Sequence, residues 1–412
     1  MNRYFFLSAL ILPVVTFMPS CEEFNPSSGE PKEIVLNKKA AEIIEADQQF
    51  AFELFSEVCS MSEETNIMIS PLSVSYALGM TFNGAVGETL DAFYDVLHFG
   101  ELTAPEVNES YKDLMNQLIH LDDRVEFSIA NSIWYREGYT VLDSFISINQ
   151  TYFDAGINEL DFSDPNAVKI INDWIEDKTN DKIQDMLDYI PPDAVMYLIN
   201  AIYFNAKWKY EFDKDDTHMG NFFLKNGSTH RTDFMKVSGG FNYTSNDDFK
   251  AVELPYGDST FSMVVLLPAE DLPVDSLVRK MDVTHWTAWF EPSAPMKVQV
   301  ELPKFTYKFK DLLNVPLINL GLGIAFSEGA DFSKINGYGG LFISRVIHQT
   351  FIDVQEEGTE AAAATIVELR ETSSLDPDPI IFRADRPFLY VIKENSTGAI
   401  LFMGKVGKPE YE

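Results

Sequence analysis

The sequence predicts an α+β fold built as one large domain. Helical periodicity dominates the first half of the chain from residue 37, and β-rich segments dominate from residue 194 onward. No repeat and no change of composition divides the chain after residue 40. Hydrophobic residues make up 46% of the 412 residues and aromatic residues 13%, so a sizeable core is available and global disorder is excluded.

Three segments show the spacing of apolar residues that is typical of amphipathic helices. Residues 37–62 carry one continuous apolar face. Residues 70–97 begin with Ser-Pro, which suits a helix N-terminus, and Asn83-Gly84 interrupts the pattern. Residues 166–187 form a strongly amphipathic stretch. We therefore expect helices in all three segments.

Strand patterns follow in the second half. Residues 194–208 are β-rich and apolar on both faces, which predicts a central strand. Residues 250–268 and 387–406 predict hairpins around Gly-Asp and Asn-Ser-Thr-Gly turns. Residues 297–310 alternate apolar and polar side chains, as a half-buried strand does.

Charge and motif content exclude several classes of function. The formal net charge of −33 repels nucleic acid and anionic lipid, so neither is an expected partner. The six histidines show no pairing at metal-ligand spacing, and the chain contains no phosphate-binding glycine loop and no nucleophile elbow. We therefore expect no metal, no cofactor and no catalytic site.

The two cysteines predict different roles. Cys59 follows Phe52 and Phe55 at helical spacing, which predicts a buried core thiol. Cys21 follows a short basic start and an apolar stretch in residues 1–20, which resembles a bacterial lipoprotein signal peptide. In that interpretation Cys21 becomes the lipidated N-terminus, and the polar residues 21–36 form a flexible tether to a single domain at 37–412.

This N-terminus predicts an exported protein on the outer membrane or the cell surface. The lipid anchor would then be the only contact with a membrane. An ordinary cleaved secretory signal, with a secreted product and a coincidental cysteine, is the alternative. The side of the membrane that the domain faces stays open.

The stretch 358–373, GTEAAAATIVELRETS, has the pattern of a strand with one buried face and one solvent-exposed face. Its first face is wholly small or apolar, and its second face carries every charge. The segment then runs into SSLDPDP, which cannot continue as a central strand. The stretch is thus suited to join a sheet, yet it is followed by an exposed loop.

The segment 356–365, EEGTEAAAAT, resembles the hinge of the reactive-centre loop of inhibitory serpins, and the resemblance extends over nearly the whole chain from about residue 40. Further blocks similar to this family occur in order at 66–90, 171–183, 198–212, 302–309, 351–365 and 386–406. The resemblance implies about nine helices around three β-sheets, with an exposed reactive-centre loop at about 356–380.

The resemblance also implies a mechanism. A serine protease cuts the loop and forms an acyl-enzyme, and the freed hinge then inserts as a new strand into the main sheet. The protease is distorted before it can deacylate, so the protein acts as a suicide substrate and is not an enzyme. Serine proteases in covalent complex are the implied partners, cysteine proteases are a further possibility, and we expect a monomer.

Individual residues take family roles by their match to family motifs. The hinge comprises Glu356, Gly358, Thr359, Glu360, Ala361, Ala362, Ala363, Ala364 and Thr365. The residues that match the region where the sheet opens are Ser70, Ser73, Asn200, Trp208 and His348.

The reactive bond is placed by counting. In the family it commonly follows the seventeenth residue from the hinge glutamate, which here predicts Thr372–Ser373. A fairly small, β-branched residue at this position suits elastase-like proteases with a shallow pocket. Arg370 is a secondary candidate for trypsin-like proteases, and Leu369 is a further one for chymotrypsin-like proteases.

The rival interpretation is a non-inhibitory serpin that acts as a binding or carrier module. Such members often carry charged, bulky or proline residues in the hinge, and this hinge has only Glu360, on the face expected to be wet. The sequence therefore favours inhibition. Whether the target protease belongs to a host or to the producing cell is left open.

Overall fold

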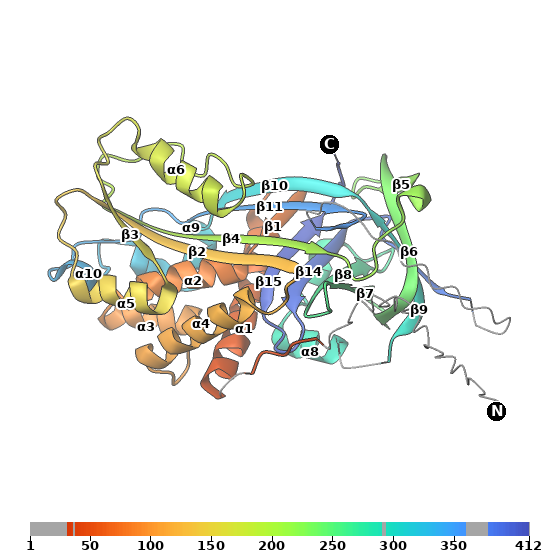
Figure 1. Ribbon diagram of the computed structural model, residues 1–412, viewed down its shortest axis with the longest axis horizontal. Helices are drawn as coiled ribbons and strands as arrows, with labels where there is room; N and C mark the ends of the chain where they lie inside the picture. Colours follow the sequence, from red (N-terminus) through yellow and green to blue (C-terminus); the bar gives the residue numbers. More distant parts are fainter. Residues whose placement is uncertain (1–30, 36–37, 291–293, 360–377, 412) are drawn as a thin grey trace, which may run out of the picture.

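The computed structural model describes residues 31–35, 38–290, 294–359 and 378–411, which form ten α-helices and fifteen strands (Figure 1). The α-helices are α1 Lys38–Met61, α2 Pro71–Phe82, α3 Gly87–Val96, α4 Ala104–Ile119, α5 Asp143–Phe153, α6 Ala167–Lys178, α7 Val274–Val278, α8 Val283–Trp289, α9 Asn314–Asn319 and α10 Ser333–Asn336, with short 3₁₀-helices η1 Lys214–Asp216 and η2 Leu322–Phe326. The predicted α+β class is confirmed.

The strands form two separate sheets. They are β1 Asn66–Ile69, β2 Val125–Arg136, β3 Gly156–Leu160, β4 Met196–Lys207, β5 His218–Phe223, β6 Thr229–Ser245, β7 Phe249–Tyr256, β8 Phe261–Pro268, β9 Met296–Pro303, β10 Phe305–Leu312, β11 Ile347–Gln355, β12 Gly358–Thr359, β13 Ile380–Arg383, β14 Phe388–Glu394 and β15 Ile400–Val406. The larger sheet has the order β1-β15-β14-β8-β7-β6-β9-β13, with β5 on β6, and the six-stranded sheet has the order β10-β11-β12-β4-β2-β3. The expected third sheet is joined to the larger one, because the long strand β6 pairs with β5 and β9 along one part and with β7 along another.

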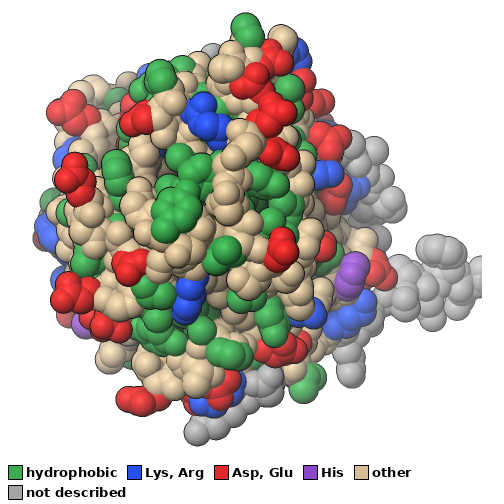
Figure 2. Space-filling view, turned by 90° about the vertical axis from the view of Figure 1, so that its left-hand side faces the viewer, with side chains coloured by type: hydrophobic (Ala, Val, Ile, Leu, Met, Phe, Trp, Pro, Cys, Tyr) green, Lys and Arg blue, Asp and Glu red, His purple; other side chains and the backbone are tan. Residues whose placement is uncertain are grey.

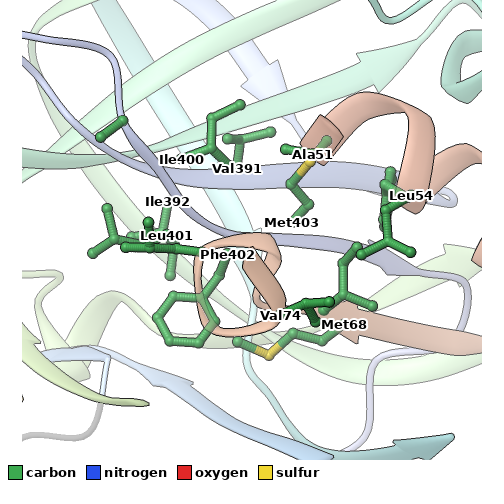
Figure 3. Packing of buried hydrophobic residues seen from close by; sticks show 14 of the residues in the cluster. Ala51, Leu54, Met68, Val74, Val391, Ile392, Ile400, Leu401, Phe402 and Met403 are labelled. Carbon is green, nitrogen blue, oxygen red and sulfur yellow. The ribbon is translucent and has the colours of Figure 1, made fainter. Parts of the chain in front are cut away.

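Helix α2 lies at the centre of the molecule, between β4 of one sheet and β15 of the other. Ser70 is its N-cap and accepts a hydrogen bond from the Ser73 amide, and Pro71 occupies the first turn. Nearly every residue of α2 is buried, as expected for a helix that is apolar all round. Figure 3 shows Val74 of this helix against Phe402 of β15 and Met68 of β1.

Two predicted segments have different bounds in the structure. The helix predicted at 166–187 ends at Lys178, because Asn180, Asp181 and Asp185 adopt positive φ angles that no α-helix continues through. The strand predicted at 297–310 is two strands, β9 and β10, which belong to different sheets. Lys304 lies at the passage between them, and its amide donates to the carbonyl oxygen of Asp233.

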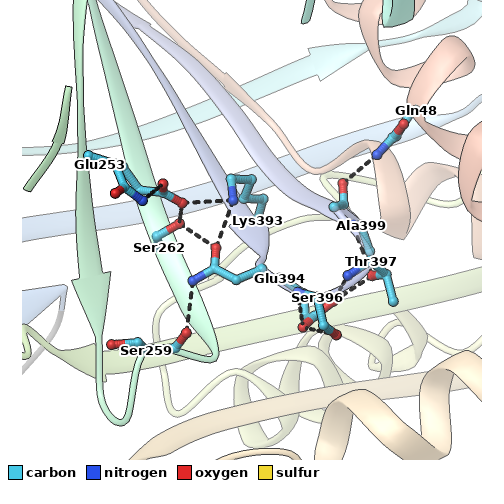
Figure 4. A network of polar contacts seen from close by, with 12 residues as sticks. Gln48, Glu253, Ser259, Ser262, Lys393, Glu394, Ser396, Thr397 and Ala399 are labelled. Carbon is cyan, nitrogen blue, oxygen red and sulfur yellow. Dashed lines mark hydrogen bonds and ion pairs between the residues drawn. The ribbon is translucent and has the colours of Figure 1, made fainter. Parts of the chain in front are cut away.

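The expected order of helices first and sheets later is only partly right, since β1, β2 and β3 lie among the helices. The predicted hairpins are both present, as β7–β8 and β14–β15. The turn of the second one is held by the buried carboxylate of Glu394, which accepts hydrogen bonds from the amides and hydroxyls of Ser396 and Thr397 (Figure 4). Cys59 is buried as predicted, and burial raises the pKa of its thiol to about 12.

Candidate functional site

The two-residue strand β12 lies in the six-stranded sheet between two strands that do not pair with each other anywhere in the described part of the chain. On one side Gly358 and Thr359 pair with Gln355 and Val354 of β11. On the other side they pair antiparallel with Lys207 and Ala206 of β4. Strands β11 and β4 continue beyond Thr359 with nothing described between them. We call the space that they enclose there the slot.

Gly358 makes the closest approach to the neighbouring strand. A Cβ atom built on Gly358 would lie 2.2 Å from the carbonyl oxygen of Ala206 and 2.7 Å from the Cα atom of Lys207. Both atoms belong to backbone, so they cannot rotate away as the end of a flexible side chain can. Only glycine therefore fits where the chain enters the sheet.

Thr359 points toward the core. Its side chain is buried, and its Oγ1 shares a hydrogen bond of 2.6 Å with the hydroxyl of Tyr256. Burial raises the pKa of Tyr256 above its ordinary value, so this phenol stays neutral. The Tyr256 ring stacks on Trp208 with centroids 4.3 Å apart. The inward face of β12 thus rests on a rigid aromatic pair.

Trp208 also ties down the turn that precedes β12. Its indole Nε1 donates to the carbonyl oxygen of Gln355 at 2.9 Å, and its amide donates to the carbonyl oxygen of Glu357 at 3.0 Å. The amide of Phe212 donates to the carbonyl oxygen of Glu356 at 2.9 Å. These three bonds fix the backbone from which any longer strand would start.

The two glutamates of this turn are held by lysines. A carboxylate oxygen of Glu356 lies 2.9 Å from the Nζ atom of Lys304, and the other accepts from the hydroxyl of Thr217 at 2.9 Å. Glu357 pairs with Lys214 at 2.5 Å. Burial alone raises the pKa of Glu356, but the hydrogen bonds from Lys304, from its own backbone and from Thr217 hold that pKa below its ordinary value. Glu356 is therefore an anion in this turn.

The slot contains a cavity of about 330 Å³. Its walls are β4 and β11, its floor is α2, and its far end is formed by residues 340–346 and by the segment after α6. Figure 2 looks at this end of the molecule and shows apolar side chains gathered around its centre. Phe342, which lines the far end of the cavity, is exposed. Among the described residues, β12 borders one end of the slot, and the cavity beyond it is mainly apolar.

A buried polar cluster lines the middle of the slot. His348 of β11 accepts a hydrogen bond at Nε2 from the amide of Ser70 at 3.0 Å, and the Ser73 amide donates to Ser70 Oγ. Because burial lowers the pKa of His348 to about 4, the ring is neutral at neutral pH and can accept this bond. The structure thus brings Ser70, Ser73 and His348 into one cluster.

Asn200 of β4 faces this cluster across the cavity. Its amide nitrogen donates to Oδ1 of Asn131 at 2.7 Å, whereas its own Oδ1 is buried without a hydrogen-bond partner. The amide oxygen of Gln349 on β11 is also buried and unpaired. A buried acceptor without a donor is costly, so both atoms favour an occupant that brings donors.

Several predicted site residues lie outside the described residues. They are the hinge residues Glu360, Ala361, Ala362, Ala363, Ala364 and Thr365, the predicted reactive bond Thr372–Ser373, the secondary candidates Leu369 and Arg370, and the lipidation candidate Cys21. Within the described residues no group of three or more His, Cys, Asp or Glu side chains is placed to hold a metal ion. No helix among them has the length and apolarity to cross a membrane.

Sequence reasoning missed Tyr256, Lys304 and Thr217. Tyr256 ends a predicted hairpin strand and gives no local indication that it meets Thr359 across the fold. Lys304 could have been noticed, because it is the charged residue between two alternating apolar stretches. Thr217 carries no pattern of its own and becomes visible only when its hydroxyl is found on Glu356.

Comparisons with known proteins agree with this architecture. The family model described as serpin (serine protease inhibitor) matches residues 45–409. An uncharacterized serpin-like protein of Methanosarcina acetivorans is 37% identical over 90% of this chain and 89% of its own length. The crystal structure of the thermophilic serpin tengpin in its native state superposes with a TM-score of 0.82 at 32% identity, covering 91% of this chain and 96% of tengpin.

The structure of human thyroxine-binding globulin in complex with thyroxine has a TM-score of 0.82 at 26% identity, covering 90% of this chain and 100% of the globulin chain. With a family model over most of the chain and relatives above 30% identity, the chain belongs to the serpin family. The family includes protease inhibitors and, as the globulin illustrates, a protein named for binding a small molecule.

Proposed function

We propose that this serpin inhibits serine proteases as a suicide substrate. The protease serine attacks the carbonyl of Thr372, an ester forms between the two, and the amine of Ser373 leaves. The hinge then fills the slot as a complete strand and carries the acyl-enzyme with it. The chemistry belongs to the protease, so the inhibitor itself needs no catalytic site.

The observation that carries this proposal is β12, which already occupies the first two positions of the strand that insertion would complete. Its register predicts where the next residues would pair. Gly358 lies opposite Gln355 and Lys207, and each step forward along the loop is one step back along both neighbours. Thr365, seven residues after Gly358, would therefore lie between His348 and Asn200.

This position matches the unpaired polar atoms of the slot. The hydroxyl of Thr365 would come close to the lone Oδ1 of Asn200, which lacks a donor. A side chain that brings one donor to a buried acceptor removes a penalty of about 1–3 kcal/mol. The only hydroxyl-bearing residue between 360 and 371 would thus lie at the buried polar cluster of a mainly apolar slot.

The alternation of faces also supports insertion. Thr359 is buried against Tyr256, so Ala361, Ala363 and Thr365 would face the core. Glu360 would face the solvent side of the sheet. All inward positions next to β12 are small, so they would meet little steric obstruction.

For specificity we propose an elastase-like target that accepts Thr372. Cleavage after Arg370 by a trypsin-like protease, or after Leu369 by a chymotrypsin-like one, would leave a shorter segment for insertion. Because trapping depends on the length that inserts, these bonds are proposed as secondary sites. Cysteine proteases remain a separate class to test.

For location we propose a monomer held at the cell surface by lipid on Cys21. The support is the pattern of residues 1–21 alone. The outer membrane is the proposed site, and a secreted form is the alternative.

The test is to mix the mature protein with a neutrophil-type elastase and, separately, with trypsin. We expect a band at the summed mass that survives denaturing gels, and a new N-terminus at Ser373. Clean cleavage without a covalent band, across a broad panel of serine proteases, would contradict the proposal and favour a carrier role. Equilibrium dialysis with hydrophobic small molecules would then be the next measurement.

A further inference from the structure

The C-terminal segment lies beside the turn that precedes β12, near the ends of β10 and β11 (Figure 1). The amide of Thr306 donates to the carbonyl oxygen of Glu410 at 2.8 Å, and Nε2 of His230 donates to the carbonyl oxygen of Pro409 at 2.8 Å. The side chain of Asn66 bonds to both the amide and the carbonyl group of Lys408. Three separate strands therefore hold this tail in place.

We call the turn at Glu356 and Glu357, which precedes β12, the hinge turn. Tyr411 in the tail contacts two residues that hold this turn, Lys304 and Gln355. Its ring lies under the ammonium of Lys304, with Nζ 4.2 Å from the ring centroid. Its hydroxyl donates to Oε1 of Gln355 at 3.0 Å. Lys304 is the lysine that pairs with Glu356, and Gln355 is the residue whose carbonyl oxygen accepts from Trp208. One side chain thus contacts both the cation that pairs with Glu356 and the side chain of the residue whose backbone accepts from Trp208.

The electrostatics suit this arrangement. The side chain of Lys304 is only 16% exposed, so its cation–π contact with Tyr411 is partly desolvated and stronger than one on the open surface. Burial, followed by the negative charges of Asp353 and Glu356, raises the pKa of Tyr411 to about 12. The phenol therefore remains a hydrogen-bond donor at every physiological pH.

We propose that Tyr411 is a positioning residue for loop insertion: it holds Lys304 on Glu356 and keeps Gln355 in its hydrogen bond with Trp208, so that the strand starts from a fixed turn. The inference rests on the proposed inhibitory function. After acylation, insertion competes with hydrolysis of the ester. A turn that is already ordered has less conformational entropy to lose before the next residues pair, so insertion wins more often.

We expect Tyr411 to affect the insertion of the loop and not the attack of the protease on the reactive bond. The bonds of Tyr411 lie at the turn, whereas Thr372 is fifteen residues beyond Glu357 in sequence. Loss of Tyr411 should therefore change the partition of the acyl-enzyme and leave the rate of its formation unchanged. A residue with only a general structural role would not separate these two quantities.

The test uses the full mature chain with Tyr411→Ala and Tyr411→Phe. The matched control is Tyr152→Ala, which removes a ring facing Lys112 at 5.8 Å on helices away from the hinge. For Tyr411→Ala we expect the number of inhibitor molecules consumed per trapped protease to rise roughly fivefold, with an unchanged acylation rate constant. Tyr411→Phe keeps the ring over Lys304 and should show less than half of this rise. Tyr152→Ala should show none.

A second readout does not need a protease. Hydrogen exchange at the amides of Trp208 and Phe212, which donate to the hinge turn, should be roughly fivefold to tenfold faster in Tyr411→Ala. If wild-type protein traps no protease, the inhibitory function fails, and this exchange result still decides whether Tyr411 orders the turn. Unchanged exchange together with unchanged stoichiometry in Tyr411→Ala would overturn the inference.

Discussion

The two ends of the slot between β4 and β11 differ sharply. At the upper end β12 is in place, bonded to both neighbours and fixed by Trp208, Tyr256 and the Lys304–Glu356 pair. Below it lies a cavity of about 330 Å³ with mainly apolar walls. In the described part of the chain, one sheet therefore contains the start of a strand and, beyond it, a cavity between the same two neighbouring strands.

The two ends of the slot therefore have different roles in insertion. The upper end uses polar and charged groups, which are directional and set the register of the incoming strand. The lower part uses apolar walls and a few unpaired acceptors, which supply the free energy of filling the slot. Variants at the upper end should therefore change whether insertion starts, and variants in the lower part should change how much stability it gains.

The largest effect is expected from a charge on the inward face. Thr359→Arg would place a guanidinium against Tyr256 and Trp208 in the interior, where an unpaired charge costs several kcal/mol. We expect covalent complexes to fall by roughly a hundredfold or more, with the protein cleaved as a substrate. Ala363→Glu should act in the same way lower in the slot.

The control for this prediction is Glu360→Arg, which carries the same new side chain one residue further on. Because the side chain at position 360 is expected to face solvent, this variant should show nearly normal inhibition in the same gel assay. Normal stoichiometry in both Thr359→Arg and Ala363→Glu would contradict insertion along this register.

Gly358→Val should have the next largest effect. Its Cβ would meet the backbone of Ala206 at 2.2 Å, so β12 could form only after β4 moved. We expect at least a tenfold rise in inhibitor consumed per trapped protease, since the displacement costs on the order of 1–3 kcal/mol. Gly240→Val, in strand β6 with its nearest neighbour, the Cβ atom of Pro295, at 3.7 Å from the added Cβ, is the comparison for glycine replacement as such.

The pH dependence of stability tests His348 in the middle of the slot. The folded pKa of about 4 lies below the ordinary 6.5, so the unfolded chain binds more protons between these values. Stability from His348 is therefore complete above about pH 6.5 and is lost as the pH falls toward 4, by about 2–3 kcal/mol. His348→Gln should remove this dependence in urea unfolding at a series of pH values.

The difference between wild type and His348→Gln is the quantity to measure, because a second buried group acts in the same window with the opposite sign. Burial raises the pKa of Asp47 to about 7, so its contribution falls as the pH rises from about 4 to 7. Parallel curves for the two proteins between pH 7 and 4 would show that His348 does not titrate in this way.

The smallest effect is expected from Thr365→Val. The two side chains have nearly the same shape, so the loss is limited to the hydroxyl that would reach Oδ1 of Asn200. We expect the cleaved, inserted form to lose about 1–2 kcal/mol of stability, with the uncleaved form unchanged. An equal loss in both forms would place Thr365 elsewhere than the predicted register.

Much of the fold could be predicted because its determinants are local. The apolar face at 37–62 and the Ser-Pro start at residue 70 became α1 and α2, and the Gly-Asp turn became the β7–β8 hairpin. The early end of α6 was missed because amphipathic spacing continues past Lys178 while the backbone does not. Strand β2 was missed because its partners, β4 and β3, lie far along the chain.

The same distinction between local and distant determinants applies to the candidate site. The alternation after Gly358 predicted which face of Thr359 is buried, because strand periodicity is local. Tyr256 and Tyr411 could not be assigned, because one contacts β12 from a distant strand and the other contacts Gln355 from the tail. Lys304 stands out locally as a charge between two apolar stretches, but its partner Glu356 does not follow from the sequence. The predicted reactive bond and lipid anchor lie outside the described residues and stay predictions.

The most direct test of insertion is the thermal stability of the protein before and after a single cut between residues 366 and 374. If the freed segment fills the slot, about a dozen new backbone hydrogen bonds form, and the unfolding midpoint should rise by roughly 10 °C or more. Thr359→Arg cut at the same bond should show little or no rise. A wild-type midpoint that stays unchanged or falls after the cut would contradict insertion and, with it, the trapping mechanism.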